Sequence, residues 1–212
     1  MALEKYEDLN DMQLDALREI GNIGSGNAAT ALADMLGKTV DIGVPRIQIL
    51  DYADVVDSLG GPEQLLVGIL LSLTGTVKGM MMFLLQKDFV QMLVRNLLGE
   101  EVDAGEGLDE MSLSAIQEVG NIMAASYVNA IASLTQLDIN ISVPMLSVDM
   151  VGAILSVPAI YYGNISDKII LIEDEFNHND EEKKVRSHIL MIPEVDSLQK
   201  IMESLGLGDE QE

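Results

Sequence analysis

The amino-acid sequence predicts an α+β fold: a single domain with pseudo-two-fold symmetry, in which long α-helices cover an antiparallel β-sheet. Three observations lead to this prediction. A segment of the first half returns in the second half, each half reads as helix, strands and helix, and the strands are short with no long helix between them. Strands joined without crossover helices favour antiparallel pairing, and helices that cover such a sheet give an α+β layer fold.

The internal repeat organises the chain. The segment Leu14–Ile23 (LDALREIGNI) returns 99 residues later as Leu113–Ile122 (LSAIQEVGNI), and the same offset carries Ile42–Pro45 onto Ile141–Pro144. A repeat of this kind indicates that one structural plan is used twice. Neither half has a linker of its own, so we predict one domain over residues 1–212, with repeats at about 10–100 and 109–206.

The first half begins with a long helix, predicted from Asp11 to Leu36 with Gly37 as its C-terminal cap. Strands follow in the runs VPRIQIL (44–50), LLVGILLSL (65–73) and GMMMFLL (79–85). A second helix is predicted from Lys87 to Leu98 and ends at Gly99.

The second half repeats this plan with one addition. A long helix is predicted over about 109–134, and the last helix over about 195–205. Between them we expect strands in 143–150, 153–160, 168–174 and 188–193. The polar run Glu173–Lys184 reads as a charged loop that is inserted in this half.

The charge balance restricts the class of partner. The chain has 35 acidic and 12 basic side chains, for a formal net charge of -23. Nucleic acids and anionic membrane surfaces would repel such a protein, because their binding depends on Lys and Arg. We therefore expect no nucleic-acid partner. A protein with a basic face or an exposed lysine would be favoured, although the charge also serves solubility.

Cysteine is absent, which excludes disulfides, thiolate catalysis and cysteine-bound metals. The acidic N-terminus is unlike a signal peptide, and the most apolar stretch, Leu65–Leu85, is interrupted by Ser72, Thr74, Thr76 and Lys78. We therefore expect no membrane insertion and a cytoplasmic protein.

Each long helix carries an acid and an amide on one face. In the first repeat, Asp15, Glu19 and Asn22 are spaced i, i+4, i+7, which places them within about one third of the helix circumference. The second repeat has the same arrangement in Ser114, Glu118 and Asn121. A solvated polar face would explain one such set. Its recurrence inside an otherwise apolar, small-residue helix favours a functional site.

The glycine-rich run Gly21–Thr30 (GNIGSGNAAT) has the look of a phosphate loop, but it lies in the middle of the predicted helix. A dinucleotide-binding loop should instead follow a strand and open a helix. Small residues that let two helices approach closely are the better explanation. The two histidines, His178 and His188, lie in no metal-like cluster, and a Ser-His-Asp triad is not signalled by a nucleophile elbow.

The motif D/S-x3-E-x2-N-x22-P fits Asp15, Glu19, Asn22 and Pro45, and it fits Ser114, Glu118, Asn121 and Pro144 at the same spacing. This pattern resembles the CheC class of chemotaxis phosphatases, which is related to CheX and to the phosphatase part of FliY. The likeness spans nearly the whole chain, and two intact copies indicate the two-site CheC class.

The resemblance implies a substrate and roles for these residues. The substrate would be the phosphoaspartate of the response regulator CheY, whose own Mg²⁺ would remain bound, so that the chain itself needs no cofactor or metal. Glu19 and Glu118 would pair with the regulator's lysine, while Asn22 and Asn121 would orient the attacking water. Supporting roles fall to the remaining motif residues: Asp15, Ser114, Pro45 and Pro144.

The resemblance also implies a second partner, the receptor deamidase CheD, and a monomeric state, because the two halves supply the symmetry that a CheX-type dimer makes between chains. One alternative is a non-catalytic chemotaxis or flagellar-switch protein with the same fold. FliM resembles the fold and lacks the Glu-x-x-Asn pairs, whereas both pairs are intact here. Another alternative makes regulation of CheD the main role, with the phosphatase secondary.

Overall fold

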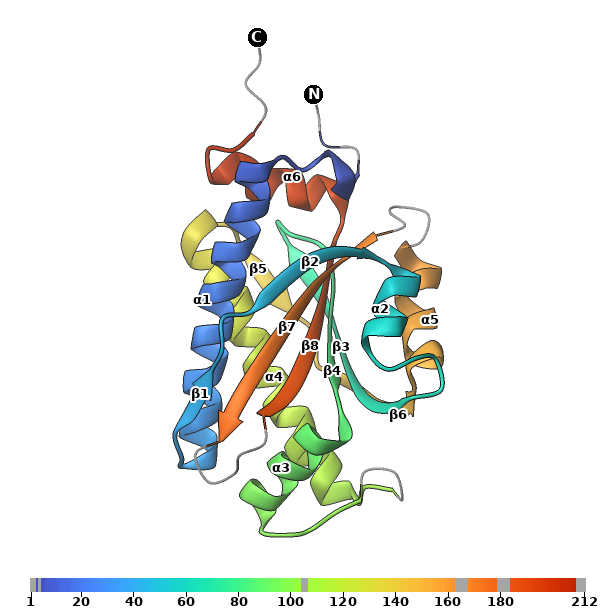
Figure 1. Cartoon of the computed structure of the whole chain (residues 1–212). Coiled ribbons are helices and arrows are strands. Elements are labelled where there is room, and N and C mark those ends of the chain that lie inside the picture. The colour runs from blue at the N-terminus through green and yellow to red at the C-terminus, as the bar shows by residue number, and fades with distance from the viewer. Residues whose placement is uncertain (1–2, 4, 104–106, 163–167, 179–183, 209–212) are drawn as a thin grey trace.

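The two halves of the chain exchange strands within one sheet (Figure 1). The structure is a computed structural model that describes residues 3, 5–103, 107–162, 168–178 and 184–208, and these residues form a single eight-stranded antiparallel sheet. Its strands are β1 (Val40–Ile42), β2 (Arg46–Asp51), β3 (Leu65–Gly75), β4 (Gly79–Leu85), β5 (Ile139–Ile141), β6 (Met145–Met150), β7 (Lys168–His178) and β8 (Lys184–Pro193).

The centre of the sheet has the order β7-β8-β4-β3. At one edge both β1 and β2 pair with β7, and at the other edge both β5 and β6 pair with β3. Because β1 and β2 belong to the first half while β7 belongs to the second, each half completes the sheet of the other. The halves therefore form one folding unit.

The helices follow the repeat closely. They are α1 (Asp11–Leu36), α2 (Tyr52–Ser58), α3 (Lys87–Leu98), α4 (Glu110–Thr135), α5 (Val151–Tyr162) and α6 (Val195–Ser204), preceded by the short 3₁₀ turn η1 (Tyr6–Asp8). The pairs α1/α4, β1/β5, β2/β6 and α2/α5 each begin 99 residues apart. This arrangement confirms the predicted α+β class.

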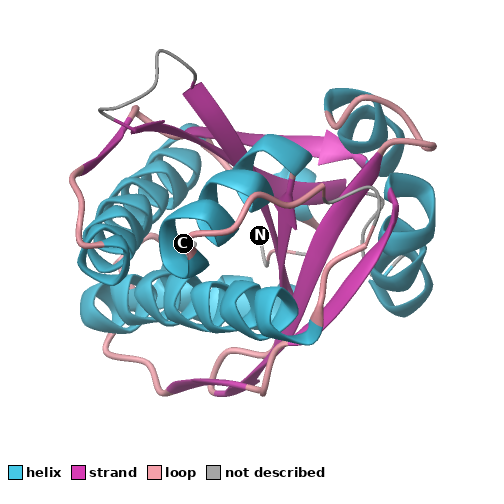
Figure 2. Ribbon diagram, turned by 90° about the horizontal axis from the view of Figure 1, so that it is seen from below, coloured by secondary structure: helices cyan, strands magenta, loops and turns pink. Residues whose placement is uncertain are grey.

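Helices cover both faces of the sheet (Figure 2). One core lies under α1, α4, α3 and α6, and a smaller core lies under α2 and α5. Along β3, Val67, Ile69 and Leu71 point into the larger core, while Leu66 and Leu70 point to the other. This burial on both sides explains why the central strands are apolar at nearly every position, a pattern more common in parallel sheets.

The prediction of a strand at 153–160 was wrong, because this segment lies within helix α5. Val151, Ile154, Leu155 and Pro158 are buried, which is the i, i+3, i+4, i+7 spacing of a helix face. A continuous apolar run does not distinguish a buried helix from a buried strand. Helix α2, the counterpart of α5 in the first repeat, was also not predicted. Extending the 99-residue offset to residue 52 would have aligned the start of α2 with the start of α5.

The prediction that Glu173–Lys184 forms a loop was wrong for its first half. Strand β7 continues through His178, with Asp174 opposite Ser187 and Phe176 opposite Val185 in β8. Asp174 and Phe176 are buried, whereas the acidic residues between and before them, Glu173 and Glu175, are only half-buried. The alternation of inward and outward side chains that marks a strand therefore continues into the acidic run. Residues 179–183 lie outside the described residues.

Helices α1 and α4 approach closely at the glycine-rich run, as the sequence predicted. Helix α1 is unbroken through this run, and Gly24 lies against the buried ring of Tyr127 in α4. A Cβ atom at Gly24 would come within 2.4 Å of the ring's Cδ1 atom. Glycine is thus required here by the neighbouring helix and not by a turn.

A buried polar cluster lies beside this contact. The Ser25 and Tyr127 hydroxyls donate to the two oxygens of Asp174, over 2.6 and 2.5 Å. Burial raises the pKa of Asp174, and these two hydrogen bonds counter part of that shift. Burial also raises the pKa of Tyr127 well above its ordinary value. The cluster ties α1, α4 and β7 together.

Two glycines of this run should respond to alanine in opposite directions. Gly24→Ala forces a methyl group into the Tyr127 ring, and overpacking of this kind costs about 1–3 kcal/mol of unfolding free energy. A Cβ atom at Gly26 would have nothing within 4 Å, so Gly26→Ala should stabilise the helix by about 0.5–1 kcal/mol. Urea denaturation of both variants measures the two effects, and equal changes would contradict the helix contact.

Candidate functional site

The acid and amide of each motif lie on the outer face of a long helix. A side chain caps the N-terminus of each helix: Asn10 Oδ1 accepts a hydrogen bond from the backbone N–H of Gln13, and Asp109 Oδ1 accepts one from the backbone N–H of Ser112. Leu17, Ile20 and Gly21 of α1 are buried against the sheet. Glu19 and Asn22 are exposed on the opposite side, as is Glu118 in α4, whereas Asn121 is half-buried.

The glycine before each motif asparagine lets the helix lie close to the sheet. A Cβ atom at Gly21 would come within 2.1 Å of Ile47 Cδ1, and one at Gly120 would come within 2.5 Å of Ile69 Cδ1. A larger residue would lift the helix away from the strands at this point. The glycine therefore brings the asparagine towards the strand connection that carries the motif proline.

The second repeat gathers its four motif residues around one hollow. Ser114, Glu118 and Asn121 come from α4, and Pro144 comes from the connection between β5 and β6. The hollow has a volume of about 460 Å³. The side chains of Glu118 and Asn121 make no hydrogen bond or ion pair with any residue that the structure describes, so both remain available to a ligand.

The first repeat gathers its motif less completely. Asn22 of α1 and Pro45 of the connection between β1 and β2 line a hollow of about 370 Å³, together with Arg18 and Arg46. Glu19 lies one turn before Asn22 on the same helix face but does not line the hollow. Asp15 is ion-paired with Arg18. The two sites are thus similar in plan and different in detail.

The comparisons with known proteins agree with this duplicated plan. The family model described as the CheC-like family matches residues 12–49 and again residues 111–148, which hold the two motif copies. The CheY-P phosphatase CheC of Bacillus subtilis is 34% identical over 205 residues, which cover 95% of this chain and 97% of that protein. The chain belongs to the CheC-like family.

Other relatives share parts of the chain or its fold. The flagellar motor switch phosphatase FliY of Bacillus subtilis is 29% identical over 143 residues, and these cover 67% of this chain and 37% of that protein. The crystal structure of Thermotoga maritima FliY has a TM-score of 0.74 at 24% identity and covers 95% of this chain and 100% of its own. A chain of the Helicobacter pylori FliG-FliM complex has a TM-score of 0.71 at 13% identity, with 92% and 100% covered. At these identities the two structures show the fold alone.

The two strand connections of this CheC-like chain are held differently. In the second repeat the Gln117 side chain donates to the Pro144 carbonyl over 2.7 Å, and Ser142 exchanges two hydrogen bonds of 3.0 Å with the Ser72 backbone. In the first repeat the backbone bond from Gly43 to Glu175, of 2.9 Å, is the counterpart of one of these. Pro144 is buried while Pro45 is half-buried, so the second hollow is the more firmly built.

Sequence reasoning missed Gln117 and the two valines that precede the prolines. Val44 and Val143 line the rims of the two hollows and are exposed. The internal repeat had already aligned Val44 with Val143, but a valine just before a strand is interpreted as the first residue of that strand. Exposure on the surface was the missing information.

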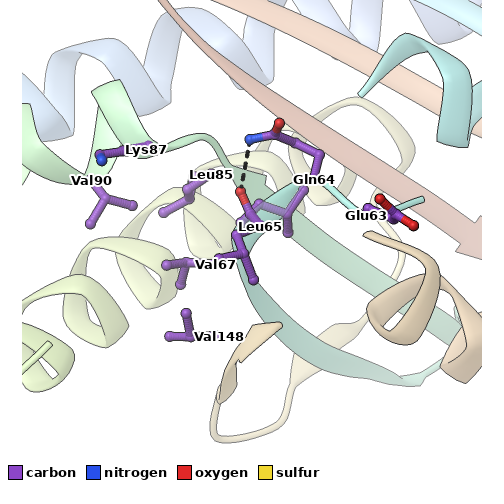
Figure 3. A pocket seen from close by; sticks show the side chains of 9 residues that line it. Glu63, Gln64, Leu65, Val67, Leu85, Lys87, Val90 and Val148 are labelled. Atoms are coloured by element: carbon purple, nitrogen blue, oxygen red, sulfur yellow. Dashed lines mark hydrogen bonds between the residues drawn. The ribbon is translucent and has the colours of Figure 1, made fainter. Parts of the chain in front are cut away.

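A third hollow lies away from both motifs (Figure 3). It has a volume of about 290 Å³ at the start of β3 and α3, and its walls include Leu85, Val90 and Val148. Gln64 at its rim donates to the Leu65 carbonyl over 3.2 Å, and Lys87 is paired with Asp103 over 2.6 Å. It lacks an acid and an amide on one helix face, so it does not match the chemistry of the other two.

Neither a membrane span nor a metal centre is found among the described residues. No helix there is long and apolar enough to cross a membrane, and no group of three or more His, Cys, Asp or Glu side chains could hold a metal ion. His188 is buried in β8, where burial lowers its pKa, and it lines neither motif hollow.

Proposed function

We propose that this protein hydrolyses the phosphoaspartate of the chemotaxis response regulator CheY, and that it does so at two sites. The observation that carries the proposal is repeated in both halves: an exposed glutamate lies one helical turn before an asparagine that lines a proline-walled hollow. Two of the relatives support it, since they are named a CheY-P phosphatase and a flagellar motor switch phosphatase.

The proposed reaction requires few chemical groups from the enzyme. An acyl phosphate is already reactive, and the regulator would bring its own bound Mg²⁺, so this chain needs neither a nucleophile nor a cofactor. A water oxygen attacks phosphorus, the bond between phosphorus and the aspartate oxygen breaks, and inorganic phosphate leaves. Placing that water in line can supply several kcal/mol on its own, because phosphoryl transfer depends mainly on positioning and electrostatics.

The motif residues suit that task. The Asn22 and Asn121 carboxamides can accept a hydrogen bond from the water without adding negative charge beside the phosphoryl group. Glu19 and Glu118, which have no partner among the described residues, would pair with the regulator's lysine and hold it in register. Asp15, Ser114, Pro45 and Pro144 would shape the helix face and the wall of the hollow.

The fold alone would also allow a non-catalytic role, because a chain of the FliG-FliM complex shares it. The intact acid and amide pairs favour the enzyme. We further propose that the chain works as a cytoplasmic monomer, since strand exchange between its halves already supplies two-fold symmetry.

Changing both motif asparagines to aspartate should greatly reduce the phosphatase activity, although the shape of the side chains is preserved. In the Asn22→Asp/Asn121→Asp variant, the new carboxylates repel the phosphoryl group, and we expect the acceleration of phosphate loss to fall by about 100-fold. Asn27→Asp/Asn129→Asp adds the same charge at exposed positions of the same helices outside the motifs and should stay active. Phosphate release from phosphorylated CheY measures both, and near-normal turnover by the motif variant would refute water positioning.

We also propose that the receptor deamidase CheD is a second partner, as family membership suggests. The phosphatase and a role in regulating CheD could operate together. Titration of purified CheD into this protein should show saturable binding by calorimetry, and no heat change with a well-folded sample would count against the pairing.

A further inference from the structure

Exposed apolar side chains recur at the same places in both repeats. Met12 is 66% exposed and Met111, 99 residues later, is 63% exposed. Val44 is 87% exposed and its counterpart Val143 is 79% exposed. Single exposed apolar residues are ordinary on protein surfaces. Here, however, two positions keep the same exposed apolar residue in both halves, although neighbouring positions such as 18/117 and 46/145 have changed.

Both positions border the candidate sites. At 100° per residue, Met12 points within about 20° of Glu19 and lies about 10 Å before it along the helix. Met111 has the same relation to Glu118 in α4. Val44 and Val143 lie on the rims of the two hollows, in the connections that carry the prolines. Each acid and amide pair therefore has an exposed apolar residue on two sides.

We propose that Met12 and Val44 in the first repeat, and Met111 and Val143 in the second, are docking contacts for the phosphorylated regulator. This inference rests on the proposed function and names the surface that the substrate protein covers. A protein whose phosphoryl group reaches the hollow must lie over the helix face and the rim together. Covering these apolar side chains would then contribute affinity, while the acid and amide between them carry the chemistry.

The rims suggest what else the partner meets. Arg18 and Arg46 line the first hollow. The corresponding residues of the second repeat are Gln117 and Met145. The two arginines have thus been replaced between the repeats, one of them by the exposed Met145, whereas the methionine and valine of the docking pair are the same in both. The shared apolar pair therefore fits one common partner surface, which both sites would recognise.

The test uses backgrounds in which one site is active. Glu118→Ala/Asn121→Ala leaves the first site, and Glu19→Ala/Asn22→Ala leaves the second. With the first site alone, Met12→Gln/Val44→Ser should raise KM for phosphorylated CheY by about tenfold and leave kcat unchanged. Met111→Gln/Val143→Ser should do the same for the second site alone. Each pair should have no effect on the other site.

Ile160→Gln is the matched control, because Ile160 is 74% exposed on α5 and lines neither hollow. A second readout does not depend on catalysis: the dissociation constant of CheY locked with beryllofluoride should rise in parallel with KM. Thermal unfolding of each variant should match that of its background, since all four side chains are exposed.

The outcomes separate the two proposals. Raised KM and raised dissociation constant at the matching site support docking. If no variant accelerates phosphate loss but the four docking substitutions still weaken beryllofluoride-CheY binding, the surface stands and the proposed function fails. An unchanged dissociation constant, or a loss of kcat alone, overturns the docking role. So does a wild-type dimer that these substitutions dissociate while CheY binding is unaffected, because a second copy would then cover the surface.

Discussion

Strand exchange between the halves is the constraint on which the rest of the structure depends. β1 and β2 pair with β7 of the other half, and β5 and β6 pair with β3. Neither half can complete its sheet alone, so the two helices and the two strand connections are fixed relative to one sheet. A motif whose parts lie about 23 residues apart in sequence, such as Asn121 and Pro144, is thereby brought around one hollow.

Close packing then sets the position of the helices. Gly21 and Gly120 let α1 and α4 lie against the strands, and Gly24 accepts the Tyr127 ring. The buried cluster of Ser25, Tyr127 and Asp174 adds a polar tie between the two halves. The repeat does not duplicate it, because the offset of 99 residues pairs Ser25 with Ala124 and Tyr127 with Ala28. The two halves thus share the same arrangement of helices and strands but differ in many side chains, so the two sites can differ without a change of fold.

The sequence was most informative where periodicity, caps and repeat coincided. The bounds of α1 and α3 followed from Gly37 and Gly99, both of which have positive φ. It failed at 153–160, because an apolar run buried on one helix face looks like a strand, and at Asp174, whose buried environment is set by residues 47 and 149 positions away. The motif faces could be predicted from spacing alone. The Gln117 bond and the exposure of Val44 and Val143 could not, because they depend on how the connections cross the helices.

Under the proposed mechanism, the chain supplies neither a nucleophile nor a metal, and the acid and amide pairs of α1 and α4 act by placing the regulator and the attacking water. The most direct measurement is phosphate loss from phosphorylated CheY, with the wild-type chain and with Glu19, Asn22, Glu118 and Asn121 all changed to Ala. Faster loss with the wild type, and none with the variant beyond the spontaneous rate, is the predicted result. Equal and unaccelerated loss with both would contradict the phosphatase and leave the motif faces as binding surfaces.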